Sequence, residues 1–129
     1  MHYYSGDLEK ATLANNYFRK VLHTGKHAQL VLMSLKVGED IGLETHNHVD
    51  QFFRFEAGQG KVVIDGETFD VKDGSAVIVP AGSEHNIINS SLTEPLKLYT
   101  LYSPANYPDG TIHQTKSDAM KAELEEHHS

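Results

Sequence analysis

The residues of this chain that are best suited to chemistry are its histidines. The 129-residue sequence contains nine histidines and no cysteine, which excludes a thiolate metal site, a cysteine nucleophile and a disulfide framework. His46 and His48 lie two residues apart in a segment expected to be a strand, where side chains at i and i+2 point to the same face. Two imidazoles on one inner face can reach one metal ion. Gln51 follows three residues later and His85 lies on a later strand, and both could complete the site.

This pattern predicts one divalent metal ion held by His46, His48, Gln51 and His85. Imidazole nitrogens and an amide oxygen suit Zn, Fe, Mn or Ni. Because all four predicted ligands are neutral, the ion would keep its full charge and attract an anionic partner such as a carboxylate, an enolate or a keto acid. Positions left open for water or ligand would make the site catalytic rather than structural.

The other six histidines are less informative about a functional site. His113 lies in an irregular segment, where a role in capping the site is the less favoured of two interpretations. The others are expected to be solvated or hydrogen-bonded, and they are His2, His23, His27, His127 and His128.

The elements that must position these residues are expected to be strands. Turn signals recur about every ten residues between apolar runs, which is typical of a sandwich or a closed barrel. The expected strands cover residues 17–23, 29–37, 52–55, 61–64, 67–72, 76–79, 85–89 and 96–102. Residues 76–79 are apolar at every position, which predicts a strand covered on both faces. Phe53 and Phe55 share the parity of Gln51 and should line the barrel interior, whereas Arg54 should face outward.

The two ends of the chain differ from its middle. We expect a single domain over residues 1–129, with an N-terminal arm at 1–16 that could hold a short helix, a barrel at about 17–103, and an irregular segment and helix at 104–129. Helix formers follow Ser117, which is a possible N-cap, up to Glu126.

Two motifs resemble those of the cupin superfamily. Residues 74–89 read G-x5-P-x-G-x2-H-x3-N, from Gly74 through His85 to Asn89, which matches the second cupin motif at each fixed position. Residues 46–58 resemble the first motif, H-x-H-x3-4-E-x6-G, with Gln51 in place of the glutamate. Two residues rather than three or four separate His48 from Gln51, and Asp40 stands where the family has a glycine six residues before the first histidine.

The resemblance implies an all-β cupin barrel, that is, a double-stranded β-helix or jelly roll, with a short C-terminal helix. It also implies a metalloenzyme acting on a small oxygenated or anionic metabolite, of the dioxygenase, isomerase, cyclase or decarboxylase type. A metal-dependent barrel that binds or senses a small molecule without catalysis is the alternative. A structural barrel with a vestigial site is the least favoured, because three histidines are retained.

Charge and composition restrict the partners. The formal net charge is -7 and no basic run occurs, which argues against binding to nucleic acid or to an anionic membrane surface. No apolar run is long enough to span a bilayer, so we expect a cytoplasmic protein with a small-molecule ligand. The resemblance to small cupins implies subunits that pair edge strands or exchange N-terminal segments. We therefore expect a homodimer in which aromatic residues near the N-terminus could be buried, namely Tyr3, Tyr4, Tyr17 and Phe18.

Overall fold

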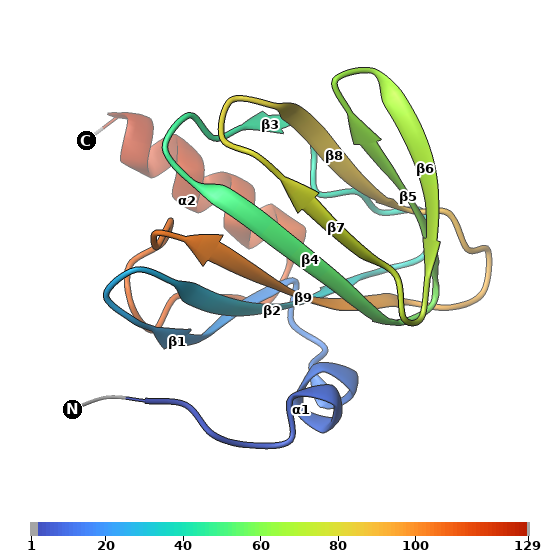
Figure 1. Cartoon of the computed structure of the whole chain (residues 1–129), viewed down its shortest axis with the longest axis horizontal. Coiled ribbons are helices and arrows are strands. Elements are labelled where there is room, and N and C mark those ends of the chain that lie inside the picture. The colour runs from blue at the N-terminus through green and yellow to red at the C-terminus, as the bar shows by residue number, and fades with distance from the viewer. Residues whose placement is uncertain (1–2, 129) are drawn as a thin grey trace.

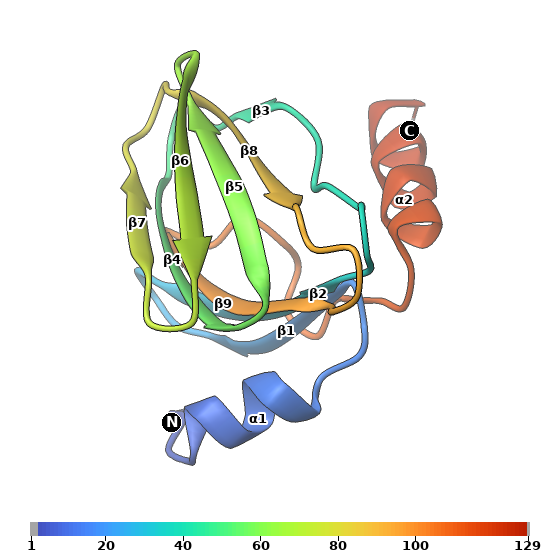
Figure 2. The ribbon, with the colours of Figure 1, turned by 90° about the vertical axis from the view of Figure 1, so that its right-hand side faces the viewer.

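Two antiparallel sheets face each other across the interior of the molecule (Figures 1 and 2). The computed structural model describes residues 3–128, and the side chains of residues 3–125. The strand order is β10-β1-β2-β9-β4-β7 in the six-stranded sheet and β3-β8-β5-β6 in the four-stranded sheet. The elements are α1 (Leu8–Ala14), β1 (Arg19–Thr24), β2 (Gln29–Leu35), β3 (Glu44–Thr45), β4 (Asp50–Ala57), β5 (Gln59–Ile64), β6 (Glu67–Lys72), β7 (Ala76–Val79), β8 (Glu84–Asn89), β9 (Leu96–Ser103), β10 (Ile112–His113) and α2 (Lys116–His128). The predicted all-β barrel with a C-terminal helix is confirmed.

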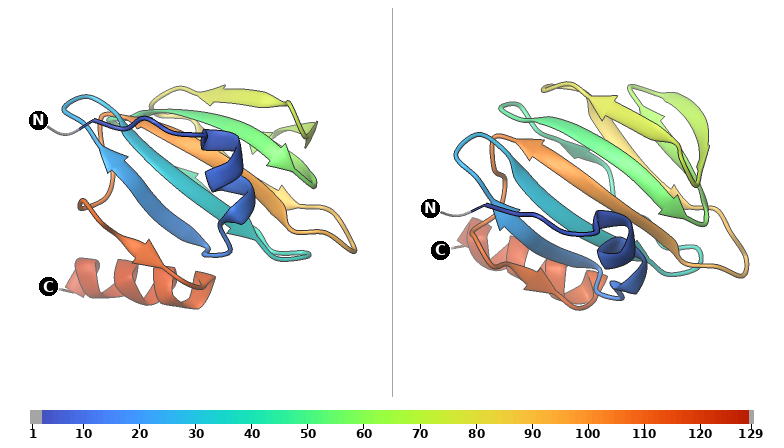
Figure 3. Two further views of the ribbon diagram at one scale, coloured as in Figure 1. Left: turned by 90° about the horizontal axis from the view of Figure 1, so that it is seen from below. Right: turned by 60° about the horizontal axis from the view of Figure 1, so that its bottom comes forward.

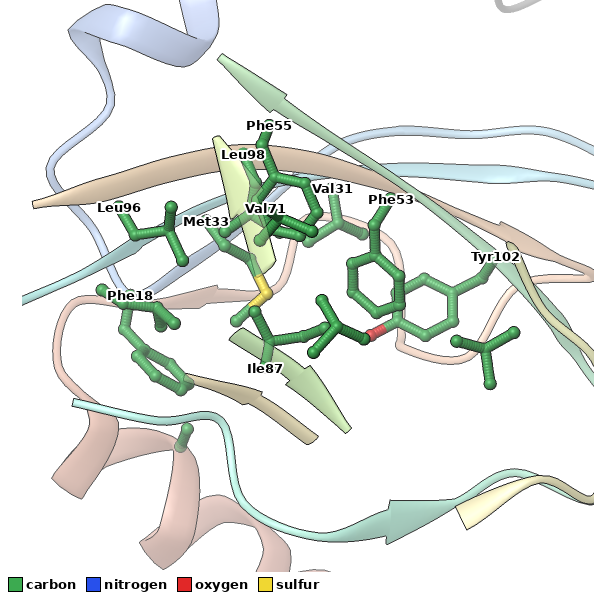
Figure 4. Close-up of a cluster of buried hydrophobic side chains, with 14 of the residues drawn as sticks. Phe18, Val31, Met33, Phe53, Phe55, Val71, Ile87, Leu96, Leu98 and Tyr102 are labelled. Carbon is green, nitrogen blue, oxygen red and sulfur yellow. The ribbon is translucent and has the colours of Figure 1, made fainter. Parts of the chain in front are cut away.

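The core lies between the inner faces of the two sheets, where buried aromatic and aliphatic side chains meet (Figure 4). Phe53 and Phe55 are fully buried on β4, as their parity predicted, and their rings stack 6.5 Å apart. Burial of one such side chain stabilises the fold by roughly 1.5–3 kcal/mol. The intervening Arg54 side chain is 37% exposed, so it points away from this core.

Turns with special backbone geometry connect the strands. Asp65 and Gly66 both have positive φ, at 48° and 86°, as the hairpin turn between β5 and β6 requires. Gly58 joins β4 to β5 with φ of +92°, and a Cβ atom there would collide with the carbonyl oxygen of Pro95. The turn therefore needs glycine for both its dihedral angle and its close approach to another backbone.

Both helices lie outside the barrel (Figures 2 and 3). The Asp7 side chain caps α1 by accepting a hydrogen bond from the Lys10 amide. The expectation that Ser117 caps the C-terminal helix was wrong. Helix α2 begins at Lys116, one residue before Ser117, so Ser117 lies inside the helix. The Thr115 hydroxyl accepts a hydrogen bond from the Asp118 amide at 3.1 Å.

The strand at residues 76–79 was expected to be covered on both faces, and this was also wrong. It forms β7, an edge of the six-stranded sheet, and Ile78 is 68% exposed. A continuous apolar run indicates two-sided burial only for an interior strand, and the sequence does not reveal which strand is the edge. Two strands were not foreseen, β3 and β10, because each has only two residues.

The N-terminal aromatic residues are divided between the core and the surface. Phe18 is buried in the chain's own core, whereas Tyr3 is 82% and Tyr17 is 38% exposed. Phe18 is therefore not available to a second subunit, and the homodimer stays a prediction. No helix in the described part of the chain is both long and apolar enough to cross a membrane.

Candidate metal centre

Glu44, His46 and His85 form a compact group at one end of the barrel. One ligand atom from each of the three lies within 4.8 Å of the others. The Nε2 atom of His46 is 2.8 Å from the Oε2 atom of Glu44, and the two imidazole ring centres are 5.5 Å apart. His85 is only 4% exposed, and the Glu44 and His46 side chains are 20% and 17% exposed. The group is thus largely shielded from solvent.

The short strand β3 explains how these residues meet. Glu44 is the register partner of His85 in the antiparallel β3–β8 pair, so their side chains lie on the same face. His46 directly follows β3, and its Nε2 atom lies 2.8 Å from the Glu44 carboxylate. The Nδ1 atom of His85 is 3.1 Å from the Ser83 carbonyl oxygen. Since a carbonyl can only accept, Nδ1 carries the hydrogen and Nε2 is left as the ligand atom.

Gln51 contributes an amide from the opposite sheet. It is 3% exposed on β4, and its Nε2 atom donates a hydrogen bond to the Thr100 hydroxyl on β9 at 3.0 Å. This bond directs the amide nitrogen to Thr100 and leaves the Oε1 atom without a partner. Gln51, Glu44 and His85 line one narrow cavity, too small to admit a water molecule, together with Ile41, Gly42, Phe53, Asn86, Ile87 and Tyr102.

Two atoms at this site are buried and unsatisfied, which is what a cation would correct. His46 Nε2 and Gln51 Oε1 have no hydrogen-bond partner. Although the Glu44 carboxylate is close to His46, the pair does not have hydrogen-bond geometry. Leaving a buried acceptor without a partner costs about 1–3 kcal/mol. Two imidazole nitrogens, one carboxylate oxygen and one amide oxygen form a donor set that first-row divalent metals accept. The residues present therefore fit a metal ion.

Two tyrosines extend from the site toward β1. The Tyr102 ring meets the His46 ring edge-on with ring centres 5.9 Å apart, and it meets Tyr107 in the same way at 5.5 Å. Burial raises the pKa of Tyr102 well above the ordinary value for a phenol, and it raises the pKa of Tyr107 as well. Both hydroxyl groups stay protonated at neutral pH, and the Tyr102 hydroxyl donates a hydrogen bond to that of Tyr107.

The loop before β3 is fastened to the wall of this cavity. The Asn86 side chain accepts a hydrogen bond from the Gly42 amide and donates one to Asp40. Lys116 at the start of α2 pairs with the same Asp40 carboxylate and lowers its pKa, as does the Asn86 bond. These contacts hold the segment that carries Glu44 against β8.

The structure brings together some of the predicted ligands but not all. His46 and His85 lie in the group, and Gln51 lines the same cavity. His48 does not join them, and its side chain is exposed. The prediction assumed an extended strand at residues 46–48, whereas β3 ends at Thr45 and residues 47–48 form a bend, so the i, i+2 rule does not apply there. His113 lies on β10 beside Arg19, and His2 and the side chains of His127 and His128 lie outside the described part of the chain.

Glu44 is the residue that the sequence analysis missed, and the spacing contained the signal. When the first cupin motif is moved two residues toward the N-terminus, it reads Gly38-x5-Glu44-x-His46-x4-Gln51-x6-Gly58. Each fixed interval of the family then holds, including the leading glycine and the four-residue gap. A glutamate takes the place of the first histidine, and a glutamine takes the place of the glutamate. The four ligands predicted from the sequence are neutral, whereas a divalent ion held by this group would have its charge reduced to about +1 by the Glu44 carboxylate.

Comparison with known proteins agrees with this geometry. A family model described as Cupin domain matches residues 31–102. The chain is 53% identical over 124 residues to the uncharacterized protein YrkC of Bacillus subtilis, an alignment that covers 91% of this chain and 66% of YrkC. It is 47% identical over 113 residues to the uncharacterized protein L612 of Acanthamoeba polyphaga mimivirus, which covers 84% of this chain and 70% of L612.

A solved structure shares nearly the whole fold. The crystal structure of BH2720 from Bacillus halodurans superposes with a TM-score of 0.91 and 44% sequence identity, covering 93% of this chain and 95% of that one. The matched family model reaches from β2 to β9 and leaves out β1 and β10 of the six-stranded sheet. The chain belongs to the cupin family.

Proposed function

We propose that this chain is a divalent-metal-dependent cupin enzyme that acts on a small oxygenated or anionic metabolite, and that oxygenase chemistry is the reaction class best supported. The observation that carries this proposal is the group of two histidines and one carboxylate within 4.8 Å of one another. Two histidines and one carboxylate with open positions are the ligand set of non-haem Fe(II) oxygenases. Glu44, His46 and His85 would hold the ion, with Gln51 as a fourth ligand or as a hydrogen-bond partner of a bound molecule.

The side chains around the group have separate roles in this proposal. The ion, when bound, would supply Lewis acidity and coordination positions for oxygen atoms of a ligand. Phe53 and Ile87 are fully buried and keep bulk water from the cavity. The Tyr102 hydroxyl, whose pKa is raised by burial, would remain uncharged beside the ion, with its hydrogen donated to the Tyr107 hydroxyl.

A second candidate function is binding or sensing without turnover. The observation that favours it is the tight packing around the group, where the space between Glu44, Gln51 and His85 is too small for a water molecule. Such a space suits a bound ion better than a substrate that must be turned over beside it.

The experiment that tests the proposal uses tag-free protein loaded anaerobically with Fe(II). Nitric oxide, a surrogate for dioxygen, should give the electron paramagnetic resonance signal of an Fe–NO adduct if open positions exist. Oxygen uptake should then be followed with acetylacetone, catechol and pyruvate as probes, and Glu44→Gln serves as the control. Fe(II) binding with an adduct and oxygen uptake supports the enzyme; Fe(II) binding without uptake of oxygen for any probe favours the binding function. Failure of Fe(II), Mn(II) and Zn(II) to bind would contradict both.

A further inference from the structure

Asn86 is a buried amide whose two ends both contact the segment that leads to Glu44. It directly follows the candidate ligand His85 on β8 and is 8% exposed. Its Oδ1 atom accepts a hydrogen bond from the Gly42 amide, and its Nδ2 atom donates one to the Asp40 carboxylate, each at 2.9 Å. One side chain therefore connects the strand that carries one candidate ligand to the segment that carries another.

The segment between β2 and β3 contains a bend that backbone pairing does not fix. Before the bend, the Ile41 amide donates a hydrogen bond to a backbone carbonyl of β8. After it, Glu44 on β3 is the register partner of His85. The bend lies at Gly42, whose φ is +108° and where a Cβ atom would meet no other atom within 4 Å. A side-chain hydrogen bond to the Gly42 amide holds the bend, and Asn86 provides it.

The Asp40 carboxylate extends this network to helix α2. One of its oxygens accepts the hydrogen bond from Asn86, and the other pairs with Lys116, the first residue of α2. Figure 2 shows α2 standing beside the segment between β2 and β3. Ala119, one turn further along the helix, is 3% exposed and belongs to the hydrophobic core, whereas Met120 is more than half exposed. The first turn of α2 thus attaches the helix to the core and to the Asp40 carboxylate.

The affinity for a metal ion depends on how exactly its ligand atoms are placed. A well-formed site holds them within about 0.2 Å of the ideal distance. Glu44 is two residues beyond Gly42, so a change in the bend moves the Glu44 carboxylate relative to the His85 imidazole. Groups that orient metal ligands without touching the ion typically contribute about 10–100-fold to the affinity. A contact that fixes this bend should therefore be measurable as metal affinity.

We propose that Asn86 is a positioning residue of the metal centre and that it couples metal binding to the docking of α2. The inference rests on the proposed function, because it requires that Glu44 and His85 hold a metal ion. Coupling between two sites is reciprocal, so a bound ion tightens the docking of α2 by the same factor by which docked α2 tightens the binding of the ion. The C-terminal helix thereby regulates how firmly the centre retains its metal.

Mn(II) titration of the full chain, followed by competition with a fluorescent chelator, tests the positioning role. Asn86→Ala should lower the Mn(II) affinity at least about 10-fold. Lys116→Met should lower it about threefold, since a partly exposed ion pair couples weakly. Lys116→Arg should keep the wild-type affinity, and a loss as large as that of Lys116→Met overturns the coupling. Lys61→Met is the matched control, because it breaks the exposed pair with Asp70 between β5 and β6 and should leave the affinity unchanged.

A double-mutant cycle separates this coupling from the plain charge of Lys116. Removal of a nearby positive charge would by itself raise the affinity for a cation, and it would do so equally with or without Asn86. We expect Lys116→Met to lower the Mn(II) affinity of the wild type and to have no effect in Asn86→Ala protein, where the connection is already broken. Equal effects in the two backgrounds, or a rise in affinity, overturn the coupling.

Hydrogen exchange on the wild type is a second measurement that needs no variant. Mn(II) should slow exchange of the Gly42 amide and of the Ala119 amide, which donates to the Thr115 carbonyl in the first turn of α2, and it should leave α1 unchanged. Equal slowing in α1, or no slowing at Gly42 and Ala119, overturns the inference.

The outcomes separate this inference from the proposed function. Mn(II) binding with equal affinity in wild type and Asn86→Ala overturns the inference and leaves the proposed function intact, whereas a wild type that binds no metal overturns both. If Asn86→Ala does not fold, Asn86→Ser replaces it. The serine hydroxyl is too short to reach both Gly42 and Asp40, so at least about a 10-fold loss is again expected, and an unchanged affinity overturns the inference.

Discussion

Gln51→Met should weaken metal binding while leaving the metal-free protein about as stable as the wild type. Methionine is unbranched and similar in length, so it can fill the same buried position on β4 without a polar atom that needs a partner. The wild-type side chain has one satisfied end, at Thr100, and one unsatisfied end, at Oε1. These two ends act on stability in opposite directions.

The size of the effect follows from those two contacts. Relief of the unsatisfied buried acceptor contributes about 1–3 kcal/mol, and leaving the buried Thr100 hydroxyl without its partner costs a similar amount of about 1–3 kcal/mol. The two effects nearly cancel, so the stability of the metal-free protein should change by less than about 1 kcal/mol. Metal affinity should fall at least 10-fold, since even residues that only orient a ligand typically contribute about 10–100-fold.

Two assays measure the two sides of this prediction. Thermal unfolding of chelator-treated protein gives the metal-free stability, and competition with a fluorescent chelator gives the Mn(II) affinity. Thr100→Val is the matched control, because it removes the acceptor that orients Gln51 while leaving the amide oxygen in the chain; it should weaken metal binding without raising Tm. A Gln51→Met protein that is destabilised by more than about 2 kcal/mol and binds Mn(II) as wild type does would refute the reasoning and make Gln51 a structural residue.

Three further outcomes follow from individual contacts. His48→Gln should leave metal affinity unchanged within twofold, because the His48 side chain is exposed and lies outside the group. Glu44→Gln should lower metal affinity at least 100-fold in the same chelator assay. Comparable losses of affinity in both variants would contradict the assignment. Asn89→Ala should lower the free energy of unfolding by about 3 kcal/mol in urea titrations. The reason is that this buried side-chain amide donates hydrogen bonds to three backbone carbonyls and accepts one from the Ser91 amide. A change below about 1 kcal/mol would show that water replaces those bonds. Lys116→Met should remove the main contact that lowers the pKa of Asp40. A carboxyl group with a lowered pKa in the folded state stabilises the fold at a pH above its unfolded-state pKa, and this stabilisation is lost as the pH falls through its folded-state pKa. The difference in unfolding free energy between wild type and variant should therefore be present at pH 7 and vanish in acid. A difference that grows in acid would contradict this.

The sequence was most informative where local rules decide the structure. Asp65-Gly66 dictates a hairpin by its own dihedral preferences, and the alternation around Phe53 and Phe55 indicates which face of β4 is buried. These signals were enough for the barrel. They failed for β7, because whether a strand lies at the edge of a sheet depends on distant partners.

The candidate site was only partly predictable for a related reason. His85 and His46 belong to motifs with fixed spacing, but the conspicuous His-x-His pair favoured an alignment two residues away from the one that the structure supports. Glu44 gains its place from the register contact between β3 and β8. Such contacts between strands distant in sequence cannot be read from one chain in isolation.

Anomalous diffraction at the metal absorption edge is the most direct test of the ligand set, using crystals of tag-free protein grown with Fe(II) or Zn(II). We predict a single strong peak within about 2.0–2.3 Å of the Glu44 carboxylate and of the His46 and His85 imidazoles, with His48 outside that distance. A peak bound by His48 and distant from Glu44, or no peak at this end of the barrel in crystals that contain the metal, would contradict the assignment.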